Sequence, residues 1–165
     1  MNSWLLRGVV MSAVHIVARV LLGVLIVNVP LHGTLWKTLA VAAVVLIAII
    51  AGGIDGLRDA HAHDDPDDYD DLTIRWLKAG LLAGWVAGFV CWLLGKFVFA
   101  GIGEASFWIE MTAGAFFTAL IIFVPAFIGA SLGRLLVRRQ QRKNAPRSDD
   151  ADESNAQFAD AAVAQ

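Results

Sequence analysis

The first indication of the architecture comes from residues 111–133, which read MTAGAFFTALIIFVPAFIGASLG. This run has no charged side chain and matches the roughly 20 apolar residues that a helix needs to cross a bilayer. Residues 38–54 and 79–95 form similar runs, and residues 8–27 would match them but for two ionisable side chains. Because only helices and closed barrels satisfy their own backbone in lipid, the pattern predicts an all-α integral membrane bundle of four transmembrane helices.

The overall composition agrees with a membrane protein. Hydrophobic residues make up 58% of the chain and charged residues 17%, whereas an average soluble domain is about 25% charged. We expect a four-helix transmembrane domain over residues 1–140 and a disordered cytoplasmic tail, rich in Asp and Ala, over residues 141–165. The expected helices are about residues 5–27, 36–54, 75–97 and 107–135, with an acidic cytoplasmic loop at 55–74.

The distribution of Lys and Arg predicts the orientation of the chain, since cytoplasmic loops are enriched in these residues. With both termini inside, ten of them lie on the cytoplasmic side, and only Lys37 and Lys96 lie outside. We therefore expect a multipass plasma-membrane protein with both termini in the cytoplasm. The basic run 134–147 then anchors the fourth helix and attracts anionic lipid headgroups, so no nucleic-acid partner is needed to explain it.

Two ionisable residues occur in the first helix, where a bilayer disfavours them. Arg19 lies about two-thirds of the way across from the cytoplasm, and His15 lies one turn earlier on the same face. An arginine near the middle of a bilayer costs about 2.5–3.5 kcal/mol and so usually finds a partner inside the bundle. Glu110, at the outer start of the fourth helix, has a matching depth, and we expect an Arg19–Glu110 pair. Alternatively, Arg19 extends outward and Glu110 faces the outer headgroups.

The third and fourth helices carry glycines four residues apart, which are Gly80, Gly84 and Gly88 on the third and Gly129 and Gly133 on the fourth. Small residues at this spacing let a second helix approach closely. The partner is either another helix of the same bundle or a second copy of the chain.

Pro125 lies within the fourth expected helix. It has no N–H to donate, so we expect a kink near Ile121, whose carbonyl loses its usual partner. Membrane helices tolerate such kinks, which often lie beside a cavity.

The loop after the second helix contains residue types that bind metal ions. Its candidate ligands are His61, His63, Asp64 and Asp65. Their spacing matches no defined metal motif, so the simpler interpretation is a solvated acidic loop in which Asp70 or Asp71 caps the third helix. No metal or other cofactor is predicted. Because the sequence also lacks a phosphate-binding glycine loop and the HExxH, CxxC and GxSxG motifs, we do not expect an enzyme.

Several short motifs resemble one family. They are Trp4-Leu-Leu-Arg-Gly8, Arg19, Asp55-Gly-Leu-Arg-Asp59, Asp71-Leu-Thr-Ile-Arg-Trp-Leu-Lys78 and Phe116-Phe-Thr-Ala-Leu-Ile-Ile-Phe-Val-Pro-Ala126. With them, residues 1 to about 137 resemble small actinobacterial (mycobacterial-type) membrane proteins of the bacterial four-TM drug/metabolite transporter (B-4DMT) family. The resemblance implies a plasma-membrane protein with a transport role, and no substrate comes with it. Small multidrug-resistance exporters also have four helices but use a first-helix glutamate, whereas residues 1–54 here contain no acid.

Two functions stay open at this point. The first is a small drug/metabolite-type transporter or transport component. Because four helices make a narrow bundle, we expect it to work as a homo-oligomer with the Gly80–Gly88 face as its interface. The alternative is a non-transporting accessory or scaffold subunit of a larger membrane complex, which binds its partners through the acidic loop and the tail. The identity of a small-molecule substrate is unknown.

Overall fold

The computed structural model describes residues 3–63, 69–98 and 106–144. The regular elements in these ranges are all helical: α1 (Ser3–Asn28), the short η1 (Pro30–His32), α2 (Gly33–Ala62), α3 (Leu72–Phe97), α4 (Phe107–Ile109), the π-helical η3 (Glu110–Gly114) and α5 (Ala115–Asn144). Four segments within the described ranges are long and apolar enough to cross a membrane: Ser3–Asn28, Pro30–Ala62, Leu72–Phe97 and Phe107–Lys143. The predicted all-α bundle is confirmed.

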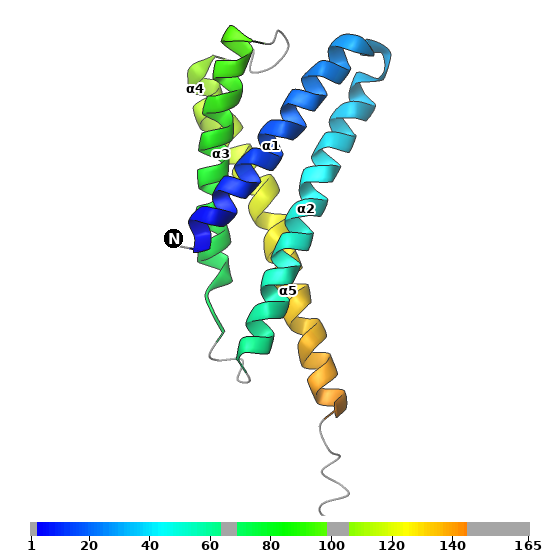
Figure 1. Cartoon of the computed structure of the whole chain (residues 1–165), viewed down its shortest axis with the longest axis vertical. Helices are drawn as coiled ribbons and strands as arrows, with labels where there is room; N and C mark the ends of the chain where they lie inside the picture. The colour runs from blue at the N-terminus through cyan, green and yellow to red at the C-terminus, as the bar shows by residue number, and fades with distance from the viewer. Residues whose placement is uncertain (1–2, 64–68, 99–105, 145–165) are drawn as a thin grey trace, which may run out of the picture.

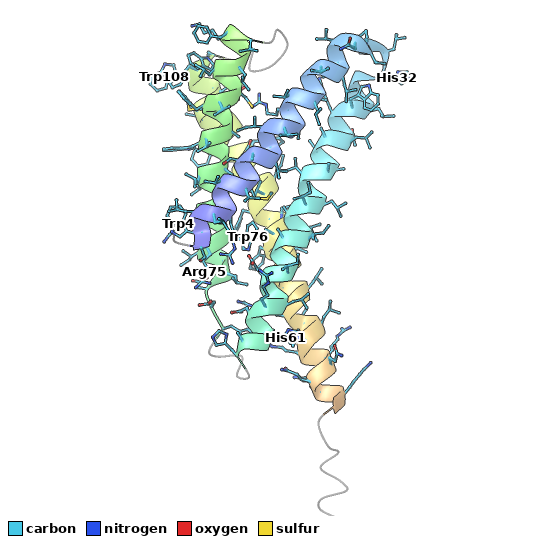
Figure 2. The ribbon with its side chains drawn as sticks, viewed as in Figure 1. Trp4, His32, His61, Arg75, Trp76 and Trp108 are labelled. Carbon is cyan, nitrogen blue, oxygen red and sulfur yellow. The ribbon has the colours of Figure 1, made fainter. Side chains whose placement is uncertain are left out.

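The helices pack as two crossed pairs. α2 packs against α5 and α1 against α3, while α3 also contacts α5. Figure 1 shows α1 starting beside α3 and leaning across to meet α2 at the turn that joins them. We call this end, which holds η1 and α4, the upper end; the lower end holds the last turn of α2 and the first turn of α3. In Figure 2, His32 and Trp108 mark the upper end, and His61 and Arg75 mark the lower end.

Small residues bring α2 and α5 into close contact. A Cβ atom on Gly52 or Gly56 would collide with the backbone carbonyl of Ala126 or Ala130 on α5. In return, a Cβ on Gly129 would collide with the backbone of α2. Gly133 faces α2 in the same way. This crossing therefore requires glycine on both helices, as is common where membrane helices pack.

Larger side chains fill the core beside this crossing and cover the outside of the bundle. Trp76 and Met11 are each 1% exposed and pack in one cluster with small residues of α2, α3 and α5. By contrast, many Leu, Val and Phe side chains face outward, such as Leu21 and Phe117. An outer surface of this kind is suited to contact with a lipid bilayer rather than water.

α2 is longer than predicted. It continues to Ala62, so the first eight residues of the expected acidic loop 55–74 are helical. The reason is that Asp55 and Asp59 are not solvated loop residues: they pair with arginines from α1 and α5. Residues 64–68 lie outside the described ranges.

α3 and α5 also extend beyond the predicted bounds. α3 begins at Leu72 instead of residue 75, because the Asp71 carboxylate accepts a hydrogen bond from the Ile74 N–H at 3.1 Å and caps the helix. α5 continues to Asn144 instead of residue 135, since residues 135–144 are mostly good helix formers such as Leu, Arg and Gln. The tail predicted to be disordered lies outside the described ranges from residue 145 onward.

Candidate functional site

A bidentate ion pair connects α1 to the start of the fourth membrane-spanning segment. The Arg19 guanidinium donates from Nη1 to Glu110 Oε2 at 2.9 Å and from Nη2 to Glu110 Oε1 at 2.7 Å. The side chains are 26% and 7% exposed, respectively. The planar fork of arginine matches both carboxylate oxygens, which is the strongest geometry for such a pair. The structure thus joins the two residues that the sequence places at one depth, and Arg19 does not extend outward.

The backbone around Glu110 is unusual. Residues Glu110–Gly114 form a π-helical turn between α4 and α5. Such turns are rare and frequently occur at functional sites. A Cβ on Gly114 would lie 2.9 Å from Glu110 Oε2, so the missing side chain leaves room for the carboxylate. Neither this turn nor the role of Gly114 could be predicted from the sequence, because π-helical turns have no short sequence signature.

His15 extends the polar region by one turn along α1. Its Nε2 lies 3.2 Å from the Thr118 hydroxyl of α5, and Thr118 is itself buried. The other ring nitrogen, Nδ1, is enclosed by protein atoms and has no hydrogen-bond partner within the described ranges. Together with the ion pair, this contact forms a polar cluster of four side chains from α1, η3 and α5: Arg19, Glu110, His15 and Thr118.

The predicted glycine face of α3 lies inside the bundle. Gly84 faces the backbone of Ala115, Gly80 faces Ala119, and Gly88 faces Met111 and the Glu110 carbonyl. α5 and η3 therefore cover this face, so it is not exposed to a second copy of the chain. Its expected use as an oligomer interface is wrong for this arrangement, and the intramolecular alternative applies.

Pro125 lies inside α5, which continues on both sides of it. The Ile121 carbonyl has no N–H to accept from at the proline. A kink at this position stays a prediction.

Of the candidate metal ligands, the structure describes His61 and His63, and each of them contacts a backbone carbonyl. His61 Nδ1 lies 2.7 Å from the Leu57 carbonyl, and His63 Nδ1 lies 3.2 Å from the Asp59 carbonyl. Asp64 and Asp65 are outside the described ranges. Among the residues that are described, no three His, Cys, Asp or Glu side chains are grouped in a way that could hold a metal ion.

A second charged network, not anticipated from the sequence, holds the lower end together. Arg134 of α5 donates from Nε to Asp59 Oδ2 at 2.8 Å and from Nη2 to the Asp70 carbonyl at 2.6 Å. Asp59 Oδ1 also accepts from the Asp70 N–H, and Arg75 makes two hydrogen bonds to the Asp70 carboxylate at 2.7 and 2.8 Å. The network therefore ties α2, α3 and α5 to the chain that precedes α3.

Arg7 and Asp55 form a further pair between α1 and α2, in which Arg7 Nε donates to Asp55 Oδ2. The signal that could have revealed it is the same depth matching that links Arg19 with Glu110, because α1 and α2 form an antiparallel hairpin. The sequence pattern instead predicts a loop at Asp55, in which the residue would be solvated.

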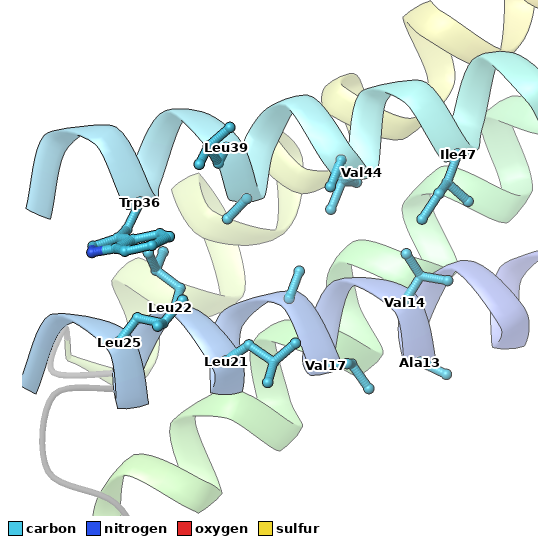
Figure 3. A pocket seen from close by; sticks show the side chains of 13 residues that line it. Ala13, Val14, Val17, Leu21, Leu22, Leu25, Trp36, Leu39, Val44 and Ile47 are labelled. Atoms are coloured by element: carbon cyan, nitrogen blue, oxygen red, sulfur yellow. The ribbon is translucent and has the colours of Figure 1, made fainter. Parts of the chain in front are cut away.

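An apolar groove of about 550 Å³ runs between α1 and α2. Its lining residues are all hydrophobic, and the Trp36 ring lies across one end near Leu22 and Leu25 (Figure 3). Arg19 is not among the lining residues, although Ala18 is. The groove and the ion pair therefore lie on different faces of α1.

Comparison of the sequence with protein-family models and with curated proteins found no match in either case.

Proposed function

We propose that this chain is a small plasma-membrane transporter or transport component of the drug/metabolite type, as its resemblance to the B-4DMT family implies. We assign the polar cluster around Arg19 and Glu110 to its substrate or coupling-ion site. The observation that carries the proposal is a bidentate, partly buried ion pair within a bundle of four apolar helices.

A purely structural role is a weak explanation for this pair. Each charge costs several kcal/mol to remove from water, and well-packed apolar residues of similar volume are often as stabilising or more so. Ionisable groups inside membrane spans commonly mark a substrate or ion path. The π-helical turn under Glu110 and the contact between His15 and Thr118 support the same interpretation, because both add polar groups that simple packing does not require.

We also propose that both termini lie in the cytoplasm and that the chain forms a homo-oligomer. The excess of Lys and Arg at the lower end supports a cytoplasmic location for that end and for both termini. A four-helix bundle is narrow for a transport path, which supports a homo-oligomer. Since α5 and η3 cover the Gly80–Gly88 face, such an oligomer would form through an outward apolar face.

The test compares two double variants in a deletion strain. Arg19→Met/Glu110→Leu removes the ion pair of the proposed site, and Arg7→Met/Asp55→Leu removes a second pair between membrane helices, α1 and α2, as a matched control. A panel of toxic compounds and nutrients first identifies conditions under which the deletion strain and the wild type differ in growth. Membrane levels of both variants are measured by an epitope tag.

We expect both variants to reach the membrane at wild-type levels, because each replaces two charges with apolar groups. Only the control should restore growth under the selected conditions. Full complementation by Arg19→Met/Glu110→Leu would show that the pair is not part of a transport path. The accessory-subunit alternative predicts a different result: no compound-dependent growth difference, and co-purification with a larger membrane complex that is lost when residues 61–71 are deleted.

A further inference from the structure

A polar pocket opens at the lower end of the bundle, separate from the polar cluster. It has a volume of about 560 Å³ and lies where α3 begins against α5. Tyr69 and Thr73 line it on one side, and Arg134, Leu135 and Arg138 line it on the other. We propose that this pocket binds the phosphate headgroup of an anionic phospholipid in the cytoplasmic leaflet.

Among the described residues, one arginine of the pocket has no carboxylate partner and is available to such a ligand. Arg134 is already paired with Asp59. Among the pocket's acidic residues, Asp70 pairs with Arg75, and Asp71 accepts a hydrogen bond from the Ile74 N–H but keeps its negative charge. Within the described ranges, Arg138 has no carboxylate partner; its Nε donates to the Tyr69 hydroxyl at 3.4 Å.

The Tyr69 ring positions this arginine. The guanidinium carbons of Arg134 and Arg138 each lie 4.9 Å from the centre of the ring, which is within the range of cation–π attraction. The fork of Arg138 is thus held beside the pocket before a ligand arrives. The Tyr69 hydroxyl, which accepts from Arg138, can donate its own proton to a phosphate oxygen, and the exposed Thr73 hydroxyl can do the same.

The location favours a lipid over a soluble phosphate compound. Leu135, which lines the pocket, is 49% exposed, and Leu132, about one turn earlier on α5, is 51% exposed. The next turns carry the exposed Arg139, Arg142 and Lys143. The apolar surface of the fourth membrane-spanning segment therefore gives way to a basic surface at this depth. A phospholipid can place its acyl chains against the leucines and its phosphate on Arg138, and basic pockets at the cytoplasmic side of membrane helices are known to bind such headgroups.

The experiment measures lipid binding to the full-length protein in detergent by native mass spectrometry. Phosphatidylglycerol is the probe, and phosphatidylcholine is the zwitterionic reference. Arg138→Gln removes the proposed ligand, and Arg139→Gln is the matched control, because it removes the same charge from the adjacent residue, which does not line the pocket. Thr73→Val is a second variant that leaves every described ion pair in place.

We expect Arg138→Gln to weaken phosphatidylglycerol binding about ten-fold or more, which is the size of one lost charge-assisted hydrogen bond. Thr73→Val should weaken it several-fold, and Arg139→Gln should have little effect. Equal losses for Arg138→Gln and Arg139→Gln would overturn the proposal in favour of diffuse surface attraction. Inorganic phosphate and glycerophosphoglycerol are added as competitors; if either displaces the lipid at equal concentration, the site recognises a soluble phosphate instead. If Arg138→Gln does not fold, the Thr73→Val result decides alone, and unchanged binding there refutes the proposal.

Discussion

Removing one partner of the Arg19–Glu110 pair should destabilise the protein far more than removing both. The side chains are only 26% and 7% exposed, so a single substitution leaves the other charge among apolar helices. For buried pairs this costs about 3–5 kcal/mol, whereas replacing both partners with apolar residues is often neutral or stabilising. We therefore expect Glu110→Leu, which leaves a guanidinium that keeps its charge, to lose about 3 kcal/mol or more of unfolding free energy.

The same cost of an unpaired buried charge predicts how stable the other variants are relative to one another. Arg19→Met should also be destabilising, because the Glu110 carboxylate loses two hydrogen bonds at once. The double variant Arg19→Met/Glu110→Leu should lie within about 1 kcal/mol of the wild type or above it. The exchange Arg19→Glu/Glu110→Arg should recover part of the loss, since it rebuilds the pair with reversed charges.

The assay is equilibrium unfolding of the purified protein in mixed micelles of a mild detergent and increasing dodecyl sulfate, followed by tryptophan fluorescence and far-UV circular dichroism. The six tryptophans provide the fluorescence signal. The two signals have to coincide for the free energies to be compared. A stability of Glu110→Leu equal to that of the wild type would refute the reasoning, because it would mean that Arg19 reaches water or headgroups without a partner.

Three further predictions use the same unfolding assay. Gly52→Ala should lower the unfolding free energy by about 3 kcal/mol or more, because its Cβ would collide with the Ala126 backbone. Gly33→Ala, whose Cβ meets nothing within 4 Å, should change stability by less than about 0.5 kcal/mol. Equal effects of the two variants would contradict the close α2–α5 crossing. Asp59→Ala should lower the unfolding free energy by about 1.5–3 kcal/mol, because Arg134 loses its charged partner. Arg58→Ala, at an exposed residue on the same turn, should be nearly neutral. If Asp59→Ala were also neutral, the network would not contribute to stability. Asp71→Ala should cost about 1 kcal/mol as a lost helix cap, with a loss well below 0.5 kcal/mol counting against the cap.

The spans and the central pair could be predicted from the sequence because both follow from depth in a bilayer. Uncharged runs such as residues 111–133 have few alternatives to a membrane helix. Once four antiparallel spans are assumed, Arg19 and Glu110 lie at one depth, and the cost of a lone charge brings them together.

The features that could not be predicted depend on which helix faces pack against each other. Glycines four residues apart indicate a close helix contact but do not identify the partner helix. For Gly84 the sequence allows either another helix of the same bundle or a second copy of the chain, and the structure has the α5 backbone there. Gly52 and Gly56 have the same spacing and were overlooked. Asp59 was assigned to a solvated loop, because an Asp-rich segment is usually solvated unless an arginine from a distant helix reaches it, as Arg134 does.

The contacts also suggest which part of the bundle can move. At the lower end, glycine contacts and the network around Asp59 fix α2 to α5 and to the start of α3. Towards the upper end, α1 and α2 lean away from α3 and α4 (Figure 1). Within the described ranges, Arg19–Glu110 is the one ion pair between α1 and the fourth membrane-spanning segment. Separating α1 from the fourth membrane-spanning segment at the upper half therefore requires this pair and the His15–Thr118 contact to break.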